Sequence, residues 1–283
     1  MANGRGFRAQ PSKFQWTFGT TGHGRPAAFK TVPLQRVGPS MSGPSDIRAL
    51  TFDVFGTAVD WRTGVAAEAR RLGRLHGVTA DWERLADAWR SLYMPYMDRV
   101  RRGELPWTNF DRLHRLSLDQ VLDDLRITGF DRAARDELTL AWQRLPAWPD
   151  SSQGLALLGE RFTVATLSNG NRSQQQELMG FTGLPFHRLI SAEDFHHYKP
   201  DPEVYLGAVA TLGLEPHQVM MVAAHKGDLR AAQAVGLRAA FVERRLEKGA
   251  SGGADLLPDP DADYQATDFV DLANQLITGR EAG

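Results

Sequence analysis

The sequence predicts an α/β fold: a parallel β-sheet whose first connection carries an inserted all-helical cap domain. Two observations support this fold class. Short apolar, β-rich runs alternate with helical windows, a pattern that forms right-handed βαβ units in a parallel sheet. The interval after the first run instead shows only helical spacing. The predicted strands span residues 49–54, 162–167, 188–191, 219–223 and 239–242.

The overall composition limits the classes of function. The chain has 283 residues, 42% hydrophobic and 24% charged, with a net charge of −1 and no cysteine. This length suits one core domain with an insertion, and the charge gives no field that favours nucleic acid. No apolar run approaches the roughly 20 residues that cross a bilayer. We therefore expect no nucleic-acid or membrane partner, no disulfide and no Cys-ligated metal, and a cytoplasmic location.

The first 45 residues differ from the rest because they contain basic residues and no acid. Such a composition occurs in transit-like leaders. We instead expect either a disordered extension or an extraneous upstream start with the working start at Met41, because no amphipathic helix or apolar signal segment is sustained. The basic residues are Arg5, Arg8, Lys13, Arg25, Lys30 and Arg36.

The first predicted strand carries Asp53 near its carboxyl end, followed by Gly56 and Thr57. Open α/β sheets bind ligands at this edge. Phe55 stands two residues after the aspartate, so no second acid adjoins it. A lone carboxylate suits a nucleophile better than a metal cage, although an isolated aspartate at a strand end also serves as a turn or helix cap.

Residues 62–148 are rich in Leu, Ala, Arg, Asp and Trp at helical spacing, with no convincing strand. The segment is longer than a single crossover connection. We predict that it forms the helical cap, and that residues 46–61 and 149–283 form the α/β core. The cap would lie over the carboxyl edge of the sheet and exclude water from a site there.

The rest of the chain continues the alternation. Helical windows at residues 202–212 and 228–235 are followed by Gly213 and Gly236, the residue type that ends helices. Residues 247–263 are rich in Gly, Asp and Pro and predict a loop. A final amphipathic helix is predicted at residues 269–276.

Three later segments also place polar groups where strands end, and a parallel sheet would bring them to the same edge as Asp53. Taken singly, each residue has a structural interpretation as a turn residue, helix cap, solvated lysine or packing tyrosine. Their order along the chain favours a site. These residues are Ser168, Asn169, Lys199, Tyr205, His225 and Asp228. The adjacent His196 and His197 predict no metal site, because neighbouring side chains point apart and no third ligand is evident.

These segments together resemble the motifs of the haloacid dehalogenase superfamily, and within it those of the type II L-2-haloacid dehalogenases. The resemblance covers about residues 46–277 and rests on residues 53–57, 168–170 and 199–201, on Tyr205, and on the spacing from Lys199 to Asp228. Trp89-Arg90 is similar to the arginine segment of these caps. The resemblance implies a Rossmann-like core with a helical cap, hydrolysis of carbon–halide bonds, no cofactor, a small 2-haloacid substrate and a homodimer.

The departures from the family pattern are informative. Phosphatases of the superfamily use a second Asp where this chain has Phe55, and bind Mg²⁺ beside it. An alkoxide needs a proton to leave whereas a halide does not, so Phe55 favours a dehalogenase. The family's usual Ser, Asn and aromatic residue in the fourth motif are replaced by Ala223, His225 and Gly227. This leaves open how the hydrolytic water is oriented and how wide the halide pocket is.

The resemblance implies a role for each residue. Asp53 attacks the substrate and forms an ester, which water hydrolyses with Asp228 as the base, assisted by His225. Lys199 keeps Asp53 ionised. The remaining roles are substrate carboxylate binding by Ser168 and backbone N–H groups, halide stabilisation by Arg90 and Asn169, apolar walls from Phe55, Trp61 and Tyr93, and a packing or site role for Tyr205. Thr57, as part of the first motif, is also expected to be a catalytic residue.

Three functions follow from this reasoning. The leading one is hydrolytic dehalogenation of short 2-haloacids such as chloroacetate, extending to defluorination of fluoroacetate. The second is a phosphatase or phosphonate hydrolase that uses the same nucleophile, which a requirement for Mg²⁺ would reveal. The third is a non-catalytic binding module, which the presence of Asp53, Lys199 and Asp228 disfavours.

Overall fold

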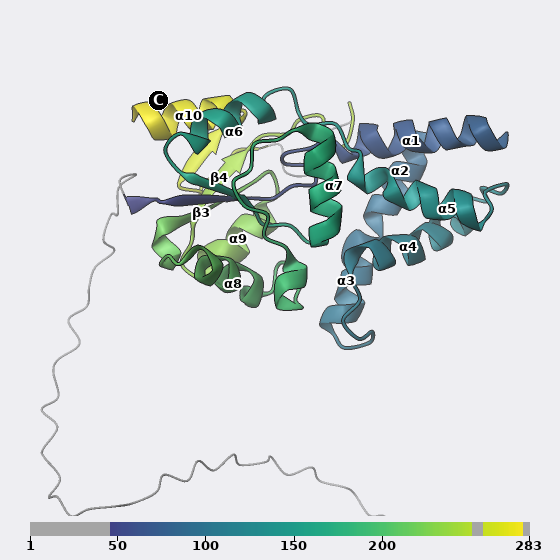
Figure 1. Ribbon diagram of the computed structural model, residues 1–283, viewed down its shortest axis with the longest axis horizontal. Coiled ribbons are helices and arrows are strands. Elements are labelled where there is room, and N and C mark those ends of the chain that lie inside the picture. The colour runs from purple at the N-terminus through teal and green to yellow at the C-terminus, as the bar shows by residue number, and fades with distance from the viewer. Residues whose placement is uncertain (1–45, 251–256, 280–283) are drawn as a thin grey trace, which may run out of the picture. The chain divides into compact units, whose positions relative to one another are not determined.

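The computed structural model describes residues 46–250 and 257–279 (Figure 1). The predicted N-terminal extension, residues 1–45, lies outside this range, as does part of the loop predicted at residues 247–263. Among the described residues, no helix has both the length and the apolar character that crossing a membrane requires.

The core is a five-stranded parallel sheet with the strand order β2-β1-β3-β4-β5, which confirms the predicted fold class. Strand β1 (Ala49–Phe52) lies between β2 and β3 and is buried along its whole length. A strand covered on both faces is apolar throughout, which explains the continuous apolar run in the sequence. The other strands are β2 (Thr163–Thr166), β3 (Val219–Ala223), β4 (Arg238–Val242) and β5 (Tyr264–Ala266).

The prediction of a strand at residues 188–191 is wrong. This segment makes only two isolated parallel bridges beside β2, from Arg188 and Ser191. The backbone N–H of Ile190 donates to the side-chain hydroxyl of Thr166 at 3.0 Å, so a side chain takes the place of a ladder partner. The fifth strand is instead β5, a short edge strand that the sequence analysis missed.

Helices cover both faces of the sheet (Figure 1). Helix α6 (Ser151–Gly159) and α10 (Phe269–Thr278) pack together on one face, and α8 and α9 lie on the other. The predicted window 202–212 coincides with α8 (Pro202–Leu212), which ends at Gly213 with a φ of 68°. The remaining core helices are α7 (Arg172–Thr182) and α9 (Lys226–Ala234).

Residues 61–148, all of which the structure describes, form five α-helices and a short 3₁₀ helix and contain no strand. Four of them begin where an Asp or Asn side chain accepts a backbone N–H of the first turn, which stabilises a helix start. The helices are α1 (Trp61–His76), α2 (Trp82–Ser91), α3 (Tyr93–Arg101), α4 (Phe110–Asp124) and α5 (Arg132–Thr139). The insertion is helical as predicted, and its domain boundaries at 62 and 148 stay a prediction.

Candidate active site

A pocket of about 690 Å³ opens at the carboxyl edge of the sheet. Its walls come from the ends of β1 and β3, from the segment before α8, from the loop after β4 and from α2 and α3 of the insertion. Asp53, Lys199 and Asp228, three groups far apart in the sequence, meet here. The parallel sheet therefore brings these predicted residues to one place.

Asp53 directly follows β1, and its backbone N–H donates to the carbonyl of Val222 at 3.0 Å, which extends the ladder to β3. Its side chain is 9% exposed. Oδ1 accepts a hydrogen bond from Lys199 at 3.0 Å, whereas Oδ2 accepts one from Thr57 at 2.8 Å and lies 3.0 Å from Nδ1 of His225. Both carboxylate oxygens are thus held in defined directions.

The charges around Asp53 keep it ionised. Burial alone would raise its pKa, but the ammonium of Lys199 and the imidazole of His225 hold that pKa well below its usual range. A nucleophilic carboxylate must be ionised to attack, so Asp53 is ready to react at neutral pH.

Lys199 bridges the two carboxylates. Its Nζ lies 3.0 Å from Asp53 and 2.6 Å from Asp228, and burial opposes its charge while the two acids raise its pKa. Asp228 lies in the first turn of α9, where its Oδ1 also accepts a hydrogen bond from Tyr205 at 2.5 Å. Burial, together with the charge of Asp53, raises the pKa of Asp228 despite the nearby ammonium. A carboxylate with a raised pKa is the better proton acceptor.

Thr57 is buried and fixed from two sides. Its Oγ1 accepts the backbone N–H of Ala224 at 3.0 Å, so its hydroxyl proton points to Asp53. Its carbonyl accepts the Nε–H of Arg244 at 2.8 Å, and Arg244 forms a buried bidentate ion pair with Asp150. Arg244 therefore anchors the turn after the nucleophile, a role that the sequence analysis missed.

His225 lies between two carboxylates, Asp53 and Glu247. Its Nε2 is 3.0 Å from Oε1 of Glu247, which also accepts the indole N–H of Trp61 at 2.8 Å. Glu247 was not predicted as a site residue, because it falls in the segment interpreted only as a loop. The available signal was its place a few residues after β4, at the same sheet edge as the other site residues.

Gly56 allows Glu247 to reach this position. The glycine has a φ of 92°, and a Cβ atom there would lie 2.2 Å from Oε1 of Glu247. We expect Gly56→Ala to lower the free energy of unfolding by at least about 2 kcal/mol, because it combines the strained φ with the clash. Chemical denaturation checks this, with Gly77→Ala as the comparison, whose φ is 66° but whose Cβ would meet nothing within 4 Å. Equal losses of unfolding free energy in the two variants would contradict the close approach of Glu247 to Gly56.

The insertion contributes a cation to the pocket. The guanidinium of Arg90, from α2, lies 4.0 Å from the ring centroid of Tyr93 and 5.5 Å from that of Trp61. Its Nη1 is buried and has no hydrogen-bond partner among the described residues. An unpaired buried N–H of a cation is costly, so this corner of the pocket suits an anion.

Of three further predicted site residues that the structure describes, Asn169 lines the pocket, whereas Ser168 and Phe55 do not. Asn169 lines the pocket and accepts the backbone N–H of Lys199 at 2.8 Å. Ser168, the preceding residue, is fully buried, and its Oγ accepts the N–H of Gly170 at 3.1 Å. Phe55 packs against Phe110 in an aromatic cluster. In the part of the chain that the structure describes, neither Ser168 nor Phe55 lines the pocket.

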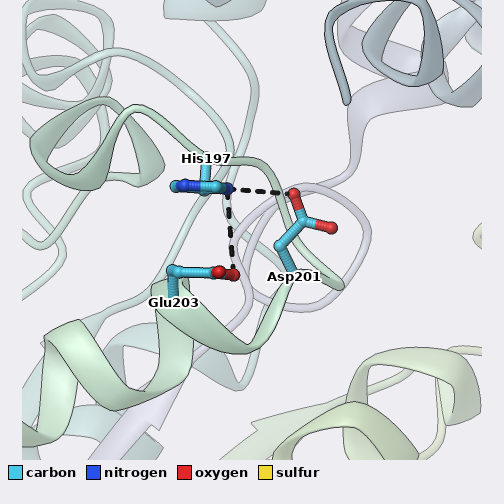
Figure 2. A group of neighbouring side chains, drawn as sticks. All are labelled: His197, Asp201 and Glu203. Atoms are coloured by element: carbon cyan, nitrogen blue, oxygen red, sulfur yellow. Dashed lines mark hydrogen bonds and ion pairs between the residues drawn. The ribbon is translucent and has the colours of Figure 1, made fainter. Parts of the chain in front are cut away.

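A separate group, His197, Asp201 and Glu203, places three potential ligand atoms close together (Figure 2). Nδ1 of His197 is 3.3 Å from Asp201 and 3.8 Å from Glu203. Asp201 also pairs with Arg101 at 2.7 Å, so an arginine already neutralises part of this acidic charge. We interpret the group as a partly exposed ion-pair cluster. The neighbouring His196 instead packs against Trp107, with ring centroids 5.3 Å apart.

Comparison with known proteins agrees with this geometry. The family model described as "haloacid dehalogenase-like hydrolase" matches residues 47–236. The chain is 30% identical to (S)-2-haloacid dehalogenase 1 of Pseudomonas sp. (strain CBS-3) over 70% of this chain and 85% of that protein. A solved L-2-haloacid dehalogenase superposes with a TM-score of 0.79 at 44% identity, covering 82% of this chain and 99% of the other.

A second solved structure, that of a defluorinating L-2-haloacid dehalogenase, also superposes with a TM-score of 0.79, at 42% identity. The alignment covers 82% of this chain and 95% of that one. The family model spans more than half of the chain, and the alignments cover 85% and 99% of the first two relatives' own length. The chain therefore belongs to the haloacid dehalogenase-like hydrolase family.

Proposed function

We propose that the protein hydrolyses the carbon–halogen bond of short 2-haloacids, giving 2-hydroxyacids through an ester on Asp53. The observation that carries the proposal is the ionised carboxylate of Asp53, which faces a pocket and has Phe55 two residues further on, where a second acid would stand. Displacing a halide requires a nucleophile and no proton donor, and this site supplies that combination.

The first half of the reaction forms the ester. Asp53 attacks the α-carbon of the haloacid in line with the carbon–halogen bond and inverts that centre. Arg90, with its Nη1 unpaired among the described residues, receives the departing halide, and Asn169 also lines the pocket. Trp61 and Tyr93 keep this corner apolar, so that solvent does not compete for the halide.

The second half regenerates the enzyme. Water attacks the ester carbonyl carbon on Asp53, and Asp228 takes its proton. Asp228 is suited to this step because its raised pKa favours proton uptake, and because Tyr205 and Lys199 fix both of its oxygens. Lys199 links the two carboxylates, so the same ammonium supports the nucleophile first and the base afterwards.

A phosphatase using the same nucleophile is the second candidate, and chelation separates the two. We expect halide release from chloroacetate or 2-chloropropionate to be unchanged by EDTA, because no step of the proposed reaction uses a metal ion. An ion-selective electrode follows the halide, and an aryl phosphate serves as the control substrate. Phosphate release that is lost with EDTA and restored by Mg²⁺, without halide release, would overturn the proposal.

Fluoroacetate is a finer part of the proposal. One of the solved relatives is described as defluorinating, which motivates the test on this chain. Halide release from fluoroacetate, chloroacetate and each enantiomer of 2-chloropropionate at matched concentrations gives the halogen and chirality preferences. We expect inversion at the α-carbon of 2-chloropropionate, and retention would contradict a single displacement by Asp53. Assembly as a homodimer and a cytoplasmic location stay predictions.

A further inference from the structure

We propose that Glu247 is a positioning residue that keeps His225 as an imidazolium, and that His225 and Thr57 together form the oxyanion hole for hydrolysis of the Asp53 ester. The inference rests on the proposed function, since it assigns roles within the second half of that reaction. It assigns His225 a role as hydrogen-bond donor, whereas the sequence suggested a base.

The positions of the two ring nitrogens fix the protonation state of His225. Nδ1 lies 3.0 Å from Oδ2 of Asp53, and Nε2 lies 3.0 Å from Oε1 of Glu247. An ionised carboxylate only accepts hydrogen bonds, so a neutral imidazole would turn one bare lone pair towards a carboxylate oxygen. With both nitrogens protonated, both contacts become charge-assisted hydrogen bonds.

Glu247 is held ionised in turn. The indole N–H of Trp61 donates to the same Oε1 at 2.8 Å, and the carboxylate is 10% exposed. Although burial opposes its charge, the imidazolium of His225 lowers the pKa of Glu247 to about 2. Burial likewise opposes the charge on His225, and the charges of Glu247 and Asp53 raise the pKa of His225 to about 10.

The charged groups around His225 come from several elements of the described chain. Asp53 faces it from the end of β1, and Glu247 faces it from the loop after β4. Lys199 and Asp228 lie beyond Asp53, and Arg90 lies across the pocket, close enough to lower the pKa of Glu247. The two carboxylates in direct contact therefore favour the imidazolium.

Both donors converge on one oxygen of the nucleophile. Oδ2 of Asp53 accepts a hydrogen bond from the Thr57 hydroxyl at 2.8 Å and lies 3.0 Å from Nδ1 of His225, whereas among the described residues Oδ1 has only the bond from Lys199 at 3.0 Å. Oδ1, with fewer hydrogen bonds, is the oxygen that attacks the substrate, and Oδ2 becomes the ester carbonyl oxygen. Thr57 and His225 then already point at the atom on which negative charge develops, as an oxyanion hole requires.

Hydrolysis of the ester passes through a tetrahedral intermediate at Cγ of Asp53. A water oxygen bonds to Cγ of Asp53, the carbonyl electron pair moves to Oδ2, and Asp228 takes a water proton. When the tetrahedral intermediate collapses, the electron pair returns from Oδ2, the bond from Cγ to Oδ1 breaks, and the proton on Asp228 passes to the departing oxygen. The carboxylic acid left on Asp53 then releases its proton to solvent.

The test is Glu247→Gln, which keeps an oxygen for Trp61 and His225 but removes the charge. Rapid-quench mass spectrometry of the intact protein with 2-chloropropionate follows formation and decay of the ester. We expect ester decay to slow by roughly 100-fold, as when one donor of an oxyanion hole is removed. Ester formation should change far less, so the ester accumulates in the variant. Glu243→Gln is the matched control, because Glu243 lies in the same loop and pairs only with Arg245 among the described residues.

The pH dependence distinguishes this role from a structural one. Because His225 works as the imidazolium, ester decay in the unmodified protein should fall at alkaline pH. This limb should lie below the pKa of about 10 that His225 has in the free protein, because the ester removes the charge of Asp53. Without the charge of Glu247 this alkaline limb should move down by about 1 to 3 pH units. An unmoved limb, or equal slowing of ester formation and decay, would overturn the inference.

If Glu247→Gln does not fold, the protonation state of His225 can still be measured by titration in the unmodified protein. NMR of ¹⁵N-labelled histidine, with His225 assigned from the spectrum of His225→Asn, reports its pKa in the unmodified protein. A pKa near the usual 6.5 would overturn the inference on its own. Absence of halide release by the unmodified protein from every haloacid tested would instead overturn the proposed function.

Discussion

Replacing Asp53 with asparagine should lower kcat for halide release by at least about 10⁴-fold, on the scale seen when a covalent nucleophile is removed. Asparagine has nearly the same shape and can still accept the hydrogen bond from Thr57, so the fold should be retained. Its neutral amide cannot displace a halide at a useful rate, and no ester should form. Halide release measured at saturating substrate, together with intact-protein mass, checks both points.

Asp60→Asn is the matched control for this variant. Asp60 lies seven residues further on and caps α1, where its side chain accepts the backbone N–H of Thr63 at 3.0 Å. Asparagine caps a helix about as well as aspartate, so activity and stability should hardly change. If Asp53→Asn kept a tenth or more of the activity of the Asp60→Asn variant, the nucleophile would have to be another group.

Replacing Lys199 with methionine should have the second largest effect, on both activity and stability. The change leaves Asp53 and Asp228 buried without the ammonium between them. Breaking a buried ion pair by removing one partner costs about 3–5 kcal/mol. The pKa values of both acids should rise, because Lys199 lowers each of them. We therefore expect halide release to fall by roughly 10³-fold at pH 7, on the scale of removing a charge that orients the reacting group.

The stability lost in Lys199→Met should depend on pH, and the pKa shift of Asp53 sets the direction of that dependence. In the unmodified protein the lowered pKa of Asp53 contributes stability above its ordinary pKa, which is lost as the pH falls through the lowered value. In Lys199→Met the carboxylates of Asp53 and Asp228 repel each other at neutral pH, and protonation removes this repulsion. The difference in unfolding free energy between the two proteins should narrow from pH 7 to pH 5.

Urea unfolding at both pH values measures this difference. Lys226→Met is the control, because Lys226 stands next to His225 in the sequence but its Nζ lies over the Phe241 ring, 5.7 Å from the centroid. A stability difference that stays constant or widens towards acid would contradict the view that Lys199 compensates two buried carboxylates.

The parts of the fold that could be predicted are those with strong local signals. The run that became β1 is apolar throughout because both faces of a central parallel strand are covered. Asp53 was singled out because it ends this run at the sheet edge where ligands bind, and because no second acid adjoins it. The bounds of α8 were predicted because Pro202 starts the helix and Gly213 ends it.

The rest could not be predicted because it depends on contacts between distant residues. Glu247 becomes a site residue only because the fold brings it to Trp61 and His225, 186 and 22 residues away. Arg244 is recognisable only through the carbonyl of Thr57, 187 residues away. Residues 188–191 have the composition of a strand, yet side chains satisfy part of their backbone. No local pattern encodes these pairings.

A single turnover in H₂¹⁸O, with enzyme in excess over 2-chloropropionate, shows whether Asp53 is the attacking group. Water then attacks the ester on Asp53, so the peptide containing Asp53 should gain ¹⁸O while the first 2-hydroxyacid formed contains only ¹⁶O. If the label appeared in the product of this first turnover and the side chain of Asp53 stayed unlabelled, water would attack the substrate directly, which contradicts the account.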